Sequence, residues 1–296
     1  LPCTVIKVSL MLNSVLLAVT LTIPWLSWDT THMENEVINA LDTARSDLLI
    51  DPTSAASWGL MAMTLEAHGI TELSFQCYEK AAQLDSVDYR WPYLAARTSS
   101  TRPDRASVFY AQAADLAPKD HAFLIDLGHF HSKLHQWNRA RRAFNRALVL
   151  VPESSHAYLG LARISWVIGN PIGALDFLDR ALEKNQENNE IYRLLAQVHQ
   201  NLGDQVAAQR ARELTTIFPN LKIPSNPLVE SIQHYNVSRE GLQNRIRHYL
   251  LDGNLWNARV TLGKLRERGF STATDWTICA EFYSNNKDFH NARRCA

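Results

Sequence analysis

The chain has 296 residues, of which 46% are hydrophobic and 20% are charged, and its 30 lysines and arginines balance its 30 aspartates and glutamates. This composition excludes a disordered chain and a polytopic membrane protein, and the zero net charge removes the basic excess that is typical of a nucleic-acid-binding domain. The cysteines lie far apart, without zinc or haem-attachment spacing, so a disulfide-rich scaffold, a zinc finger and a c-type cytochrome are disfavoured.

The first predicted element is a membrane segment within residues 1–29. No residue from Val8 to Trp28 is charged, and this apolar run is long enough to cross a bilayer. Lys7 precedes the run and acidic residues follow it, so the positive-inside rule places the rest of the chain on the extracytoplasmic side, periplasmic or extracellular. We expect an uncleaved signal anchor; the alternatives are a cleaved signal peptide and a buried first helix.

Beyond this segment, the sequence repeats itself. Pro118 and Pro152 are 34 residues apart, and Pro52 precedes Pro118 by 66, close to two such periods. The period is that of a helix-turn-helix repeat. Within each period a large residue is followed three positions later by an apolar residue and then by a small one, as in Trp58-Met61-Ala62, Leu124-Leu127-Gly128, Tyr158-Leu161-Ala162 and Tyr192-Leu195-Ala196.

The repeated residues have a physical explanation. A small residue such as Gly128 or Ala162 lets the second helix of a pair approach the first closely. Gly69, Gly169 and Gly203 fall where a left-handed residue would end the first helix, and the prolines stop the second. Each pair alone cannot cover its apolar face, so neighbouring pairs are expected to stack.

This pattern resembles the tetratricopeptide repeat family over residues 35–296. The resemblance implies an all-α, right-handed solenoid of helix pairs. We expect a repeat array over 35–220, with a weaker copy at 87–118, then a proline-containing linker over 221–237 and further repeat-like helix pairs over 238–296. The last expected helix is cut at the end of the sequence, so we also expect the chain to be a piece of a longer product.

A narrower resemblance rests on the anchor followed by repeats and on three short segments. These segments are Tyr89-Arg90-Trp91-Pro92-Tyr93, Asn226-Pro227-Leu228 and Asn236-Val237-Ser238. They are similar to segments of membrane-anchored or exported bacterial repeat proteins. Some of those proteins are joined to cytochrome domains, but this sequence has no haem motif, so that association is not carried over.

In the solenoid that the resemblance implies, the first helix of each pair lines a concave groove, which is the default surface for binding a partner. The mixture of aromatic, basic and amide side chains predicted there suits an extended peptide of acidic character. The alternative is that these are ordinary solvated positions. The predicted partner-binding residues are His129, Lys133, Arg163, Trp166, Arg193 and Gln197.

Two other clusters admit a functional interpretation. His131 and His135 are one helical turn apart, but a metal site is disfavoured because His131 should pack in the core and His135 falls in a turn. A basic stretch without acids is interpreted as a solvated outer helix face, with a site for an acidic partner or a lipid headgroup as the alternative; it contains Arg139, Arg141, Arg142 and Arg146.

No catalytic motif is present in the sequence: it has no nucleophile elbow, phosphate-binding loop, dinucleotide fingerprint or zinc-protease motif. We therefore predict a non-catalytic, membrane-anchored scaffold or adaptor without cofactor or metal, which binds protein or peptide partners and no nucleic acid. The alternatives are a recruitment module of a longer enzyme or electron-transfer protein and an assembly part that associates with itself. Cys77 and Cys279 are interpreted as small packed hydrophobic residues.

Overall fold

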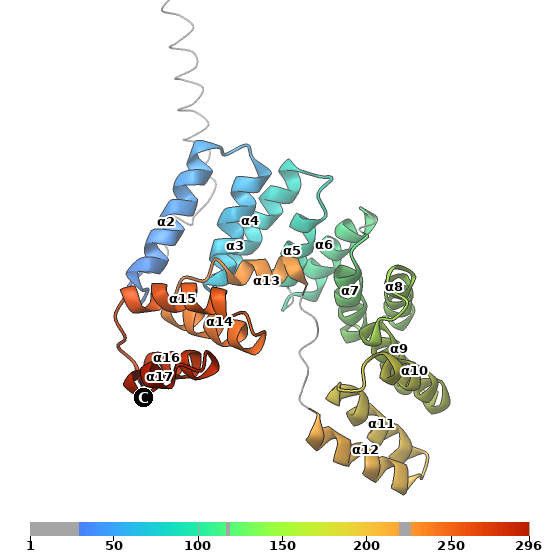
Figure 1. The fold of residues 1–296 in the computed structure, drawn as a ribbon. Helices are drawn as coiled ribbons and strands as arrows, with labels where there is room; N and C mark the ends of the chain where they lie inside the picture. Colours follow the sequence, from blue (N-terminus) through green and yellow to red (C-terminus); the bar gives the residue numbers. More distant parts are fainter. Residues whose placement is uncertain (1–29, 100, 117–118, 219–225, 296) are drawn as a thin grey trace, which may run out of the picture. The chain divides into compact units, whose positions relative to one another are not determined.

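The computed structural model describes residues 30–99, 101–116, 119–218 and 226–295, and within these ranges all regular secondary structure is α-helical (Figure 1). The predicted signal anchor or signal peptide at 1–29 lies outside the described residues. Among the described helices, none combines the length and the apolar character needed to cross a membrane.

The chain forms two compact units. The central unit comprises Pro103–Pro227, and the split unit comprises Leu1–Arg102 together with Leu228–Ala296. The central unit contains the helices α6 (Pro103–Asp115), α7 (His121–Lys133), α8 (Trp137–Leu150), α9 (Ser155–Val167), α10 (Pro171–Lys184), α11 (Asn189–Asn201) and α12 (Gln205–Ile217).

The split unit is built from two stretches of sequence that are far apart. Its first stretch contains α2 (Asn35–Ile50), α3 (Ala55–Ala67), α4 (Thr71–Leu84) and α5 (Arg90–Thr98). The second stretch contains α13 (Pro227–Gln233), which begins at the boundary, α14 (Arg239–Leu251), α15 (Leu255–Glu267), α16 (Ala273–Asn285) and α17 (Phe289–Cys295). Helix α13 lies inside the range 221–237 that the sequence suggested as a linker.

The 34-residue period is visible in where the first helices begin. Helices α7, α9 and α11 start at successive 34-residue steps, and α16 starts 34 residues after α14. The residue before each of the three central helices is a side-chain cap: Asp120, Ser154 and Asn188 each accept a hydrogen bond from a backbone N–H of the first turn. The helix-turn-helix repeat predicted from the prolines is therefore confirmed.

In several helix pairs the turn between the two helices places one residue in the left-handed region. Gly169 has a φ of 82°, and Gly69 and Gly203 hold the same repeat position with positive φ, as predicted. His135 (φ 56°) and Lys287 (φ 58°) occupy this position in two other pairs. The repeat phase thus continues into the C-terminal pair of the split unit.

Close helix packing in the central unit depends on Gly128. A methyl group there would lie 2.5 Å from Cε1 of Phe144, whose ring comes from α8 and is fully buried. A methyl group at Gly160 on α9 would overlap the same ring. The predicted role of a small residue at Gly128, close approach of the second helix, is confirmed by this contact.

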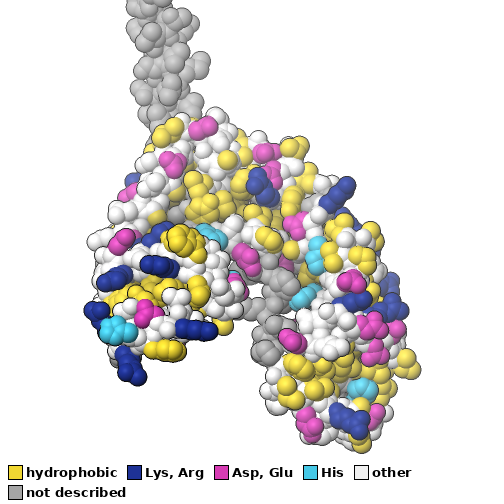
Figure 2. Space-filling view, in the orientation of Figure 1, with side chains coloured by type: hydrophobic (Ala, Val, Ile, Leu, Met, Phe, Trp, Pro, Cys, Tyr) yellow, Lys and Arg dark blue, Asp and Glu magenta, His cyan; other side chains and the backbone are white. Residues whose placement is uncertain are grey.

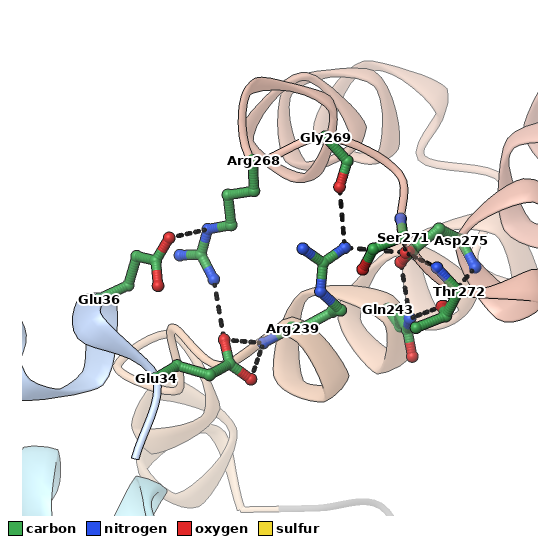
Figure 3. A network of polar contacts seen from close by, with 9 residues as sticks. All are labelled: Glu34, Glu36, Arg239, Gln243, Arg268, Gly269, Ser271, Thr272 and Asp275. Carbon is green, nitrogen blue, oxygen red and sulfur yellow. Dashed lines mark hydrogen bonds and ion pairs between the residues drawn. The ribbon is translucent and has the colours of Figure 1, made fainter. Parts of the chain in front are cut away.

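A polar network joins the two stretches of the split unit (Figure 3). The Glu34 carboxylate, before α2, accepts hydrogen bonds from the backbone N–H of Arg239 at 3.0 and 2.9 Å and lies 3.4 Å from the Arg268 guanidinium. Arg268 also contacts Glu36 at 3.5 Å. The Arg239 guanidinium donates to Asp275 at 2.8 Å, so the network continues to the start of α16.

Asp275 is fully buried, yet it is charged. Burial alone would raise the pKa of its carboxyl, but hydrogen bonds from the Gln243 side chain and from the backbone N–H groups of Thr272 and Ser271 lower that pKa to about 2. Thr272 and Asp275 also form a capping box at the start of α16. The same carboxylate therefore caps a helix and anchors the network.

The prediction for Cys279 as a merely packed residue was wrong. Cys279 and Cys295 form a disulfide that joins α16 to α17, with their Cα atoms 5.7 Å apart. The prediction failed because the wide spacing of the cysteines was taken to disfavour disulfides, whereas a separation of 16 residues brings facing positions of two paired helices together. Cys77 is a free, buried cysteine, and burial raises its pKa to about 12.

Candidate functional site

The predicted partner-binding residues lie on the first helices of three successive pairs in the central unit. His129 and Lys133 are on α7, Arg163 and Trp166 are on α9, and Arg193 and Gln197 are on α11. Helix α9 contacts both α7 and α11. We call the surface formed by these six side chains the first-helix surface.

At the centre of this surface, Arg163 forms an ion pair that the sequence did not suggest. Its Nη2 lies 2.5 Å from Oε2 of Glu190, which projects from the first turn of α11, and both side chains are partly exposed. Arg163 is therefore not a free cation but one held by a neighbouring repeat. An acidic ligand would compete with Glu190 for this guanidinium.

His129 lies beside this ion pair. Burial lowers the pKa of its imidazole to about 4, and the nearby positive charges of Arg163 and His156 contribute, with Lys133 adding less, while Glu190 opposes the shift. The ring packs edge-on against Phe144, with the ring centroids 5.3 Å apart. At neutral pH His129 is thus an uncharged member of the surface.

His156 and Glu190 are the residues that sequence reasoning missed. His156 follows His129 by 27 residues, and Glu190 follows Arg163 by the same 27. This common offset connects the middle of one first helix to the start of the next, so comparing adjacent repeats could have found both. Burial lowers the pKa of His156, and the charge of His121 contributes.

The remaining predicted residues differ in whether their side chains contact other residues. Lys133, Arg193 and Gln197 are exposed, and their side chains make no hydrogen bond or ion pair with any other residue that the structure describes. Trp166 is half-buried and packs against the apolar cluster between α9 and α11. The structure therefore brings His129, Lys133 and Arg163 into electrostatic range of one another and leaves Arg193 and Gln197 open to solvent on the next helix.

His131 on α7 and His135 in the turn after it contact different partners. His131 Nδ1 lies 2.9 Å from Oε1 of Gln136, whereas the His135 ring meets Trp137 edge-on with centroids 5.2 Å apart. Across the described part of the chain, no three potential metal ligands gather at one point. On the face shown in Figure 2, cationic and acidic side chains are interspersed over both units.

A family model described as tetratricopeptide repeat matches residues 136–198, which span α8 to α11. This segment of the chain carries tetratricopeptide repeats. The match includes the whole of α9 and most of α11, and so four of the six residues of the first-helix surface. No curated protein matches the sequence.

Solved structures that resemble this chain include that of YrrB, which is described as a tetratricopeptide repeat protein. YrrB is 16% identical, with 66% of this chain and 99% of that chain covered and a TM-score of 0.51. A MamA structure from Desulfovibrio magneticus RS-1 is 14% identical, with 55% and 93% covered and a TM-score of 0.51. PilF of Pseudomonas aeruginosa is 17% identical over 81% and 99% of the two chains, with a TM-score of 0.49.

At these identities the first two likenesses show the all-helical repeat fold and no more. That fold is a protein–protein interaction scaffold, and its members are in general not catalytic. A tetratricopeptide repeat scaffold leaves the exposed residues of its first helices free to vary, because packing positions alone specify the stack. Function in this chain must accordingly be argued from the first-helix surface itself.

Proposed function

We propose that the central unit binds an extended acidic segment of a partner protein along the first-helix surface. The observation that carries this proposal is the presence of two cations without a partner among the described residues, Lys133 on α7 and Arg193 on α11, the two first helices that contact α9 and its Arg163. The structure of YrrB is described as that of a repeat protein with an unusual peptide-binding site, which supports peptide binding as a use of this fold.

Each side chain has a distinct part in the proposed complex. Lys133 and Arg193 meet carboxylates of the ligand, and Arg163 exchanges Glu190 for a ligand carboxylate. Trp166 offers an apolar face whose orientation is fixed by packing, and the Gln197 amide can bond to the ligand backbone. Because a few anchors carry most of the affinity of an interface, these contacts suffice for binding. The proposed function requires no catalytic step.

The test is selection from a peptide library displayed on phage, followed by fluorescence titration of the selected peptides. We expect enrichment of Asp and Glu, and we expect the double variant Arg163→Gln/Arg193→Gln to weaken binding by about tenfold or more because two charged contacts are lost. Glu190→Gln should tighten binding, since the competing carboxylate is removed.

The matched control is Arg180→Gln/Arg210→Gln, which removes the same charge from exposed positions on the second helices α10 and α12. It should leave affinity nearly unchanged. Peptides without acidic enrichment, or peptides that bind the Arg163→Gln/Arg193→Gln variant as well as they bind the parent, would contradict the proposal.

We also propose that the chain is membrane-anchored through residues 1–29 and that its repeats lie on the extracytoplasmic side. The Cys279–Cys295 disulfide supports this location because such bonds persist in oxidising compartments and are rare in the cytosol. The alternative function, recruitment of a substrate to an active domain outside residues 1–296, would use the first-helix surface in the same way.

A further inference from the structure

Helix α8 carries an unusual set of charges. Its sequence, WNRARRAFNRALVL, contains four arginines and no acidic residue. Arg139, Arg142 and Arg146 project from one side of the helix and line a cavity of about 380 Å³ between α6, α7 and α8. Arg141 does not line it. We call this cavity the α8 pocket.

The other walls of the α8 pocket are largely apolar. Tyr110, Ala111 and Ala114 come from α6, and Leu127 and His131 come from α7. The Tyr110 ring packs against Phe130, with the centroids 4.3 Å apart, so this wall is fixed by the core. The pocket therefore combines an apolar wall with a cationic one, and its volume falls in the range of small-molecule sites.

The cationic wall lacks counter-charges. Among the described residues, Arg142 and Arg146 have no hydrogen-bond or ion-pair partner, and Arg139 meets only the amide oxygen of Gln136, at 3.3 Å. Asp115 is the one carboxylate that lines the pocket in the described part of the chain. Guanidinium groups remain charged at any physiological pH, so an anion in the pocket would relieve their mutual repulsion.

We propose that the α8 pocket binds a small organic molecule that carries a doubly charged oxyanion, as a phosphate ester or a dicarboxylate does. Guanidinium groups match both phosphate and carboxylate oxygens through paired N–H donors. The wall formed by Tyr110 and the alanines receives the organic body of the ligand. The lining residues of this site are not those of the first-helix surface.

The experiment is isothermal titration of the full chain, at constant ionic strength, with phenyl phosphate, phthalate and inorganic phosphate. We expect saturable binding of one molecule of phenyl phosphate or phthalate per chain, about tenfold or more tighter than inorganic phosphate because only the first two fill the apolar wall. Whichever of the two binds more tightly identifies the oxyanion. Absence of saturable binding by both would overturn the proposal.

Variants separate a built pocket from general ionic attraction. Arg142→Gln/Arg146→Gln should weaken binding by about tenfold or more, whereas Arg141→Gln, on the same helix but outside the pocket, should not. Ala111→Leu fills the exposed side of the cavity without changing charge and should also weaken binding. Asp115→Asn should tighten it, because the repelling carboxylate is removed.

Two outcomes of the variant experiments would also overturn the proposal that the α8 pocket binds such a ligand. One is an equal loss of affinity in Arg141→Gln and in Arg142→Gln/Arg146→Gln, which would indicate attraction to the whole helix. The other is unchanged binding in Ala111→Leu, which would place the ligand outside the cavity. Because the substituted side chains are exposed, circular dichroism should show the parent's helical content and thermal transition in each variant.

Discussion

At the residue scale, the small residues of the repeat explain both what the sequence predicts and what it does not. Gly128 is predictable because it holds the small position of the repeat, and the structure places it against the Phe144 ring. Gly160 lies outside that pattern, yet it meets the same ring from the next helix. Its role depends on the three-dimensional position of one aromatic side chain, which periodicity does not encode.

We predict that Gly128→Ala destabilises the central unit. The added methyl group would lie 2.5 Å from a fully buried ring that has little room to move. Overpacking costs about 1–3 kcal/mol, and an overlap this close with a buried ring belongs to the upper part of that range, above the roughly 1 kcal/mol that alanine gains over glycine in a helix. Urea denaturation followed by circular dichroism measures the difference in the free energy of unfolding.

Gly263→Ala is the matched control for this prediction. Gly263 is also inside a helix, α15, but open space surrounds the position of its missing methyl group. Only the helix propensity changes there, so we expect stabilisation by about 0.5–1 kcal/mol. Equal effects of the two substitutions would show that the Phe144 contact is unimportant.

For the predicted partner-binding residues too, the sequence indicates the position on a helix but not the contacts of the side chain. Repeat phase places His129, Arg163 and Gln197 on the first helices, and the structure agrees on those helices. The Arg163–Glu190 pair could not be read from the pattern alone, because both charges occupy variable positions whose contact depends on how adjacent pairs stack. The functional assignment of the first-helix surface stays a prediction.

At the scale of elements, turns and covalent links differ in how well the sequence reveals them. Gly169 indicates a left-handed turn, because a residue without Cβ adopts that conformation freely. His135 and Lys287 adopt the same conformation without such a signal. There, the helices on either side fix the turn, and local preference is overridden.

The disulfide between α16 and α17 leads to a prediction at this scale. It closes a loop of 16 residues, and a link of that size stabilises a fold by about 3 kcal/mol, mainly by restricting the unfolded chain. We expect a reducing agent to lower the denaturation midpoint of the split unit and to leave the central unit unchanged. Hydrogen exchange followed by mass spectrometry resolves the two units.

The control is Cys279→Ser/Cys295→Ser, which should behave under oxidising conditions as the parent does after reduction. The reducing agent should have no further effect on this variant. A parent whose split unit exchanges at the same rate before and after reduction would contradict a stabilising role for the bond.

At the scale of the whole molecule, the main surprise is that residues 228–295 share a unit with the start of the chain. Glu34 and Arg239 meet although 205 residues separate them. A 34-residue period describes contacts between neighbouring pairs only, and a polar contact between distant segments leaves no periodic trace in the sequence. The repeats were therefore predictable, but their division into a central unit and a split unit was not.

We predict that Glu34→Ala loosens the split unit. The substitution leaves the backbone N–H of Arg239 without its acceptor and removes an ion pair to Arg268. Since the Glu34 side chain is 39% exposed, water compensates in part, and we expect a loss of about 1 kcal/mol. Hydrogen exchange should accelerate at the start of α14 and remain unchanged in the central unit.

Asp42→Ala is the control, because Asp42 is also an acid of the α2 region but pairs only locally, with Arg45, at an exposed position. It should have almost no effect on exchange in α14. Equal acceleration by the two variants would mean that α2 stabilises α14 through general charge rather than through the Glu34 contact.

The split unit also has a consequence for the timing of biosynthesis. When Thr98 has been added to the chain, the partner segment that begins near Arg239 has not yet been made, and at about 5–20 residues per second the ribosome reaches Arg239 roughly 7 to 30 s later. The central unit is synthesised during that interval, whereas Glu34 and Glu36 still lack their ion-pair partner Arg268. The first helices made are thus among the last to complete their unit.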